Sequence, residues 1–220
     1  MVATEVVSLP LKVAFDPKDR TSDNAKAQTE GYKIISTAPG FIESWYGGVV
    51  ENDKELQMFI NWKAVSDHIA FTQSPVYAEM GKHLASILGG APSYVHYHFT
   101  SQDELKTALS APVTETVTFY FPTETKAFEE NLTKFRGAVE SDAIGAKGYA
   151  WGWGEEEVEH EKLEGKKGKA LKLLIGWESV EAHMKFRETE TFQKNIALFR
   201  EGPSAVEMVH VKARPQSEAI

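Results

Sequence analysis

The chain has 220 residues, a mass of 24.5 kDa and a formal net charge of −8. This acidic balance argues against nucleic-acid binding, which needs clustered Lys and Arg to neutralise phosphates. The absence of cysteine excludes disulfides, thiolate metal sites and a thiol nucleophile. No apolar run of about 18 residues and no leader pattern occur, so we expect a cytoplasmic protein with no membrane partner and nothing cleaved from it.

In the first half, apolar alternation and helical periodicity predict strands and helices in the order β-α-β-β-α-β. Turn and cap residues separate them, among them Pro39-Gly40 and Gly89-Gly90. The expected strands are 5–13, 41–49, 55–62 and 93–99, and the expected helices are 23–36, 65–71 and 76–88.

The second half predicts the same order. Its first helix carries an apolar stripe at Phe128, Leu132, Phe135 and Val139. The expected strands are 116–121, 146–154, 170–177 and 204–212, with helical segments at 128–139 and 179–200 and a charged, solvated loop at 155–168. The fold class is therefore α+β, with ferredoxin-like units at 1–100 and 114–213, a linker at 101–113 and a tail at 214–220.

One motif occurs in both halves at a constant offset. A Trp is followed by Val three residues later, His six later, Phe nine later and an aromatic residue fifteen later. The matched pairs are Trp62/Trp177, Val65/Val180, His68/His183, Phe71/Phe186 and Tyr77/Phe192. This agreement indicates an internal duplication.

With this motif and element order, the chain resembles the dimeric α+β barrel superfamily, and within it the antibiotic-biosynthesis-monooxygenase-like (ABM) proteins. The resemblance implies that two units pair as a barrel, here as an intramolecular pseudo-dimer, with further homodimerisation left open. It also implies a pocket between the sheet and the helices of a unit. Enzymes of this kind are largely cofactor-free oxygenases, cyclases, isomerases and lyases acting on phenolic or polyketide substrates, and other members bind haem.

The histidines are the first candidates for chemistry. His68 and His183 suit a general base, because imidazole titrates near neutral pH, but a structural role bridging helix and strand is the alternative. His96 and His98 alternate with Tyr94 on one strand, so the three side chains share a face. Alignment places Ala205, Glu207 and Val209 opposite them, which favours the first unit as the active one.

Other candidates surround the first motif. Asn61 is a candidate oxyanion donor, with Gly176 as its counterpart, and Tyr46 is a candidate proton relay. Structural roles, as a strand-end hydrogen bond or as core aromatics, are the alternatives. The expected substrate-binding side chains are aromatic, and they are Trp45, Trp62, Phe71 and Tyr94. Their expected equivalents in the second unit are Trp151, Trp177 and His183.

Taken with the resemblance, these residues predict a cofactor-free enzyme on an aromatic or polyketide-like small molecule, of monooxygenase, cyclase or lyase type. The deprotonated substrate would react with O₂ or with an internal carbonyl. A non-catalytic binding or stress-related protein is the second hypothesis, and haem binding is the third. A metal site at His96 and His98 would need further ligands, such as His68 or Glu43, and no metal is expected.

Overall fold

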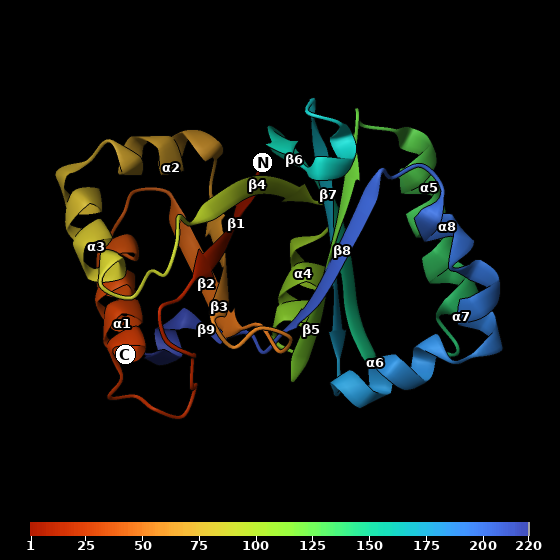
Figure 1. The fold of residues 1–220 in the computed structure, drawn as a ribbon, viewed down its shortest axis with the longest axis horizontal. Helices are drawn as coiled ribbons and strands as arrows, with labels where there is room; N and C mark the ends of the chain where they lie inside the picture. The colour runs from red at the N-terminus through yellow and green to blue at the C-terminus, as the bar shows by residue number, and fades with distance from the viewer. Residues whose placement is uncertain (220) are drawn as a thin grey trace. The chain divides into compact units, whose positions relative to one another are not determined.

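The computed structural model describes residues 1–219 and has the predicted α+β architecture. The chain divides into two compact units, and each unit folds in the order β-α-β-β-α-β (Figure 1). Of the described residues, unit 1 comprises 1–98 and 211–219, and unit 2 comprises 99–210. Among the described residues, no helix has the length and apolar character needed to span a bilayer.

Unit 1 is an antiparallel sheet in the order β4-β1-β3-β2-β9. Alternate side chains of β1 and β3 form an apolar core with the helices, where Trp62 is fully buried. Its elements are β1 (Ala3–Pro10), α1 (Asp23–Ile35), β2 (Phe41–Gly48), β3 (Glu55–Trp62), α2 (Val65–Thr72), α3 (Pro75–Ala85), β4 (Ser93–Phe99), β9 (Arg214–Pro215) and the 3₁₀ turn η2 (Gln216–Ala219).

Unit 2 repeats this strand order as β8-β5-β7-β6. The predicted stripe of α5 is buried against β5 and β7, beside Trp177. Its elements are α4 (Gln102–Leu109), β5 (Val113–Phe121), α5 (Lys126–Val139), β6 (Ala146–Glu159), η1 (Glu161–Leu163), β7 (Lys167–Trp177), α6 (Val180–Arg187), α7 (Glu190–Asn195), α8 (Ala197–Arg200) and β8 (Ala205–Val211).

The segment expected to be a linker contains a packed helix. Ser101 caps α4 by accepting a hydrogen bond from the Glu104 amide, and Leu105, Ala108 and Leu109 are buried. Within unit 2, α4 lies on the opposite side of the sheet from α5–α8 (Figure 1). The tail also differs from expectation, because β9 pairs with β2 of unit 1.

The charged stretch predicted as a solvated loop is instead mostly a β-hairpin. Strand β6 continues to Glu159, and after a register shift Glu157 and Glu159 lie opposite Lys169 and Lys167 of β7. Opposite charges across neighbouring strands favour this pairing. Sequence polarity suggested a loop because these strand ends bury few apolar side chains.

We expect Leu105→Ala to lower the free energy of unfolding by about 2–5 kcal/mol, because it leaves a cavity under α4. Chemical denaturation measures the change. Exposed Lys106→Ala on the same helix is the matched control and should change stability by less than about 0.5 kcal/mol. Equal stability of the two variants would contradict a packed α4.

Candidate functional site

The repeated motif of unit 2 assembles a buried Trp–Glu–His–His cluster. The indole Nε1–H of Trp177, at the end of β7, donates to Glu115 Oε2 at 2.9 Å. His183 Nε2 lies 3.4 Å from the same oxygen, and His183 Nδ1 lies 2.8 Å from His210 Nε2. The ring of His183 stacks on Trp177 with centroids 4.9 Å apart. The motif thus holds a carboxylate and two imidazoles together.

Unit 1 contains the same cluster. Trp62 Nε1 donates to Glu5 Oε2 at 2.9 Å, and His68 Nδ1 lies 2.8 Å from His96 Nε2. One detail differs, because His68 Nε2 faces the other carboxylate oxygen, Glu5 Oε1, at 3.5 Å. Both oxygens of Glu5 therefore face cluster members.

Strand register explains how distant residues meet in this cluster. Glu5 of β1 lies opposite His96 of β4, so the two side chains share the helix-facing side of the sheet. Trp62 ends β3, and α2 begins three residues later at Val65, which places His68 on the first turns above the indole. Neither Glu5 nor Glu115 was a sequence candidate. Their signal was a charged residue in an otherwise apolar strand pattern.

The expected asymmetry between the histidines is wrong. Sequence alignment placed Glu207 opposite His96, but the structural counterpart of His96 is His210. Glu207 instead accepts a hydrogen bond from the Tyr120 hydroxyl at 2.8 Å and faces His160. His96 lies three residues after Ser93 and His210 six residues after Ser204, so matching Ser93 with Ser204 did not bring the two histidines into register.

The Asn61/Gly176 difference also has a packing cause. Asn61 is adjacent to Trp62 on β3 and so faces the other side of the sheet from His68, where its Oδ1 accepts from Thr4 at 2.7 Å. At Gly176, an added Cβ would come within 2.4 Å of the Lys147 carbonyl oxygen of β6 and within 2.9 Å of the Ala108 Cα in α4. Glycine is needed there because both β6 and α4 lie against the strand.

Several predicted residues lie apart from His68. Tyr46 is buried opposite Met58 of β3, four residues before Trp62, so the two side chains are about 13 Å apart along the strand direction. The Arg214 guanidinium lies 4.9 Å from the centre of the Tyr46 ring. Trp45 faces the opposite side of β2 from Tyr46, and its buried Nε1 has no hydrogen-bond partner among the described residues.

Other predicted residues do surround the unit 1 cluster. Phe71 packs on Trp62, and half-exposed Tyr94 sets its ring edge against His68 (5.4 Å between centroids) and His96 (5.6 Å). His98 lies farther along β4, with Nδ1 3.3 Å from the Val2 carbonyl oxygen.

A cavity of about 180 Å³ opens beside the unit 2 cluster. Its lining is apolar and largely aromatic, apart from Glu115, His183, Arg187 and Arg200. Trp151, predicted as a second-unit pocket residue, does not line it. An apolar cavity with a few convergent polar groups is the usual form of a small-molecule site.

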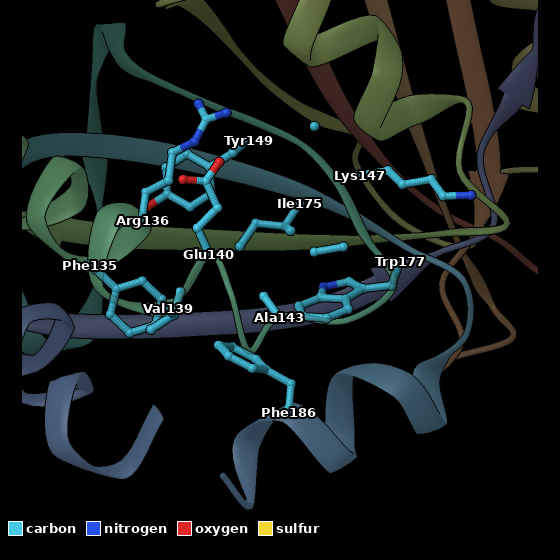
Figure 2. A pocket seen from close by; sticks show the side chains of 12 residues that line it. Phe135, Arg136, Val139, Glu140, Ala143, Lys147, Tyr149, Ile175, Trp177 and Phe186 are labelled. Carbon is cyan, nitrogen blue, oxygen red and sulfur yellow. The ribbon is translucent and has the colours of Figure 1, made fainter. Parts of the chain in front are cut away.

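A second cavity of about 120 Å³ is lined by Trp177 (Figure 2). The side chains of Phe135, Trp177 and Phe186 line one part of it, and Arg136 and Tyr149 gather at another (Figure 2). Tyr149 is held by its hydroxyl, which donates to the Leu132 carbonyl at 3.1 Å, and burial raises the pKa of this phenol. This cavity contains no member of the carboxylate–imidazole set.

Glu115 has the chemistry of a base in its cavity. Burial raises the pKa of its carboxyl to about 7, opposed by the Trp177 hydrogen bond and the charges of His210 and Arg187. Oε2 holds both Trp177 and His183, and no hydrogen bond or ion pair within the described residues uses Oε1. A carboxylate with one open oxygen and a pKa near neutrality suits proton abstraction.

The fold was compared with known proteins. No family model matches the sequence, and a comparison with curated proteins gave no significant match. An anthrone oxidase-like protein superposes with a TM-score of 0.64 at 15% identity, over 100% of this chain and 95% of its own. A candidate monooxygenase from Lactobacillus acidophilus gives 0.58 at 9% identity over 98% and 94%, and a candidate chlorite dismutase gives 0.57 at 12% over 99% and 96%.

The chain shares its fold with these proteins. The predicted resemblance is therefore confirmed for the architecture, over nearly the whole length of both chains. At sequence identities this low, the roles of individual residues cannot be transferred from these proteins, so function must be argued from the geometry of this chain.

We expect Trp177→Phe to raise the Glu115 pKa by roughly 1–2 units, because the carboxylate loses its indole donor. Carbon-13 NMR titration of labelled Glu carboxyls measures this. Trp153→Phe is the matched control, since it removes an indole donor from Glu129 and leaves Glu115 untouched. An unchanged Glu115 titration in Trp177→Phe would contradict the assignment.

Proposed function

We propose that this protein is an enzyme that removes a proton from a small aromatic or polyketide-like substrate in the unit 2 cavity. Glu115 is the general base. The carrying observation is that Glu115 lines an apolar cavity while Trp177 and His183 fix its Oε2, which leaves Oε1 outside the hydrogen bonds and ion pairs of the described residues. The fold shared with proteins described as monooxygenases supports an enzyme of this kind.

The cavity favours a flat, apolar substrate of one or two fused rings. Phe119, Phe135, Phe186 and Phe199 contribute aromatic walls, and the volume of about 180 Å³ is small. Such a wall binds a ring by burying its apolar surface and by edge and face contacts.

Arg187 is placed to stabilise the charge that proton removal creates. It lines the cavity, and within the described residues no carboxylate forms an ion pair with it; its Nη1 donates only to the Met184 sulfur at 3.8 Å. A guanidinium beside a developing enolate or phenolate oxygen lowers the barrier to deprotonation. The corresponding position of unit 1 is Thr72.

The histidines keep the base ready for the next turnover. His183 orients Glu115 through Nε2, while Nδ1 is linked to His210 at 2.8 Å, so a proton taken by the carboxylate has an imidazole pair beside it. This arrangement gives His183 a positioning and proton-handling role. The predicted catalytic roles of His68, His96, His98, Asn61 and Tyr46 stay predictions.

The carbanion can react in two ways, and atoms and electrons balance in both. With O₂ as co-reactant, an activated methylene loses two hydrogens and becomes a carbonyl; one oxygen atom stays on carbon and the other leaves as water. Without O₂, the same carbanion attacks an internal carbonyl and forms a ring. Product analysis distinguishes oxygenation from cyclisation.

Haem does not fit this site. Both ring nitrogens of His183 already face Glu115 and His210, so neither is directed at an iron, and a porphyrin is larger than the cavity. A protein that only binds ligands remains the alternative function, and turnover of a probe separates it from an enzyme.

We expect the protein to accelerate exchange of the C1 protons of 2-tetralone in D₂O, followed by proton NMR. This bicyclic ketone carries an activated methylene of the required kind. Glu115→Gln should lower the exchange rate about 10²–10⁴-fold, as loss of a general base does. Glu207→Gln, on the same unit but outside the cavity, should exchange like the wild type. Wild-type exchange at the rate of buffer would leave the binding-only alternative.

The exchange rate should also depend on pH through Glu115. The active form is the ionised carboxylate, so with a pKa of about 7 the rate should fall tenfold per pH unit below about pH 7 and level off above it. Rates measured from pH 5 to 9 test this. A flat profile, with the fold intact by circular dichroism, would exclude Glu115 as the base.

A further inference from the structure

We propose that Phe135, Ile175 and Phe186 form a partition that limits the length of the substrate that unit 2 accepts. The partition lies between the cavity lined by Glu115, here called the base cavity, and the second cavity of about 120 Å³. Each of the three residues lines both cavities, so each presents atoms to both spaces. The limit applies to the substrate of the proposed function, whereas the partition follows from the two cavities alone.

The partition is formed by three different elements of unit 2. Ile175 lies on β7, Phe135 on α5 and Phe186 on α6. All three side chains are buried, and Figure 2 shows them around the second cavity. The sheet and two of the helices that cover it therefore each contribute one apolar side chain between the cavities.

Aromatic neighbours hold the two phenylalanine rings of the partition in place. The Phe135 ring lies 4.0 Å from that of Phe199 between centroids. The Phe186 ring lies 5.2 Å from Phe192 on one side and 5.4 Å from Trp177 on another. A ring packed against several others in a dense interior is costly to displace. A substrate in the base cavity therefore meets a fixed end at the partition.

The polar groups of the second cavity are engaged with one another. Arg136 forms an ion pair with Glu104 at 3.0 Å, and its guanidinium lies 5.4 Å from the centre of the Tyr149 ring. The Tyr149 hydroxyl donates to the Leu132 carbonyl. What this cavity offers beside the partition is apolar surface, which suits the extension of a longer flat molecule.

Unit 1 shows what occupies the same place when the phenylalanine is absent. Four buried positions of α1 have the spacing of the apolar stripe of α5, which matches Phe135 with Gly31; they are Asn24, Gln28, Gly31 and Ile35. A Cβ added at Gly31 would lie 3.9 Å from Leu84 and Met80 of α3. In unit 1 a helix thus packs where unit 2 has the Phe135 ring, so the partition is specific to unit 2.

Quinoline and acridine test the partition, because they are flat molecules of two and three fused rings. Calorimetry on the full chain, at alkaline pH where both are uncharged, measures their affinities. We expect the wild type to bind quinoline, and to bind acridine at least tenfold more weakly. Wild-type protein that binds acridine as tightly as quinoline, or that binds neither, would overturn the proposal without any variant.

Phe135→Ala should join the cavities of about 180 and 120 Å³ and raise acridine affinity about tenfold or more, because the third ring is then buried. Quinoline affinity should change much less. Phe128→Ala is the matched control, since Phe128 is buried on the same helix but lies outside both cavities. An equal gain in acridine affinity in the two variants would contradict the partition.

A further substitution tests whether the gain uses the second cavity. Ala143 lines that cavity and not the base cavity. Ala143→Leu added to Phe135→Ala should remove the gain in acridine affinity and leave quinoline binding unchanged. A gain that persists in the double variant would overturn the proposal.

The outcome is separate from that of the proposed function, because binding of these probes needs no proton transfer. Glu115→Gln should lose 2-tetralone exchange and keep the preference for quinoline over acridine. Exchange that does not depend on Glu115 would remove the proposed base and leave the partition standing. Lost size preference with normal exchange would do the reverse.

Discussion

The hydrogen bond from a strand-end indole to a buried glutamate is the interaction on which both units depend. A carboxylate buried without partners is costly, and the Trp62 and Trp177 donors supply a fixed, charge-assisted contact to Glu5 and Glu115. The same indoles form the surface on which the motif histidines stack. One side chain therefore fixes the carboxylate, the imidazole and the start of the following helix.

Periodicity and the internal repeat predicted much of the fold, because strands and helices with one buried face leave a regular apolar pattern. The hairpin ending at Glu159 was missed, since it is stabilised by cross-strand charges. Residues 101–113 show a short helical pattern, but the packing of α4 was missed because it comes from contacts with distant strands. Only some members of each cluster were predicted. The histidines lie in a recognisable motif, whereas Glu5 and Glu115 reach them only through strand register.

The two copies share a cluster and differ in what surrounds it. In unit 1 the phenol rings of Tyr77 and Tyr94 approach the carboxylate and imidazoles, and the nearby Glu5 charge and burial raise the Tyr77 pKa. In unit 2 a cavity lined by Phe192 and Arg187 takes their place. A duplicated chain can keep one arrangement for folding while the surroundings of that arrangement differ between the copies.

The close approach of α4 to Gly176 makes the halves non-interchangeable. A hybrid built from two copies of unit 1 would carry Asn61 at both positions, and a side chain there leaves no room for a helix on that strand. A hybrid of two copies of unit 2 would carry α4 and its glycine in each copy, because both lie within residues 99–210. A recombination that separates α4 from its glycine would place a side chain where the helix packs, so the connector and the strand are sterically coupled.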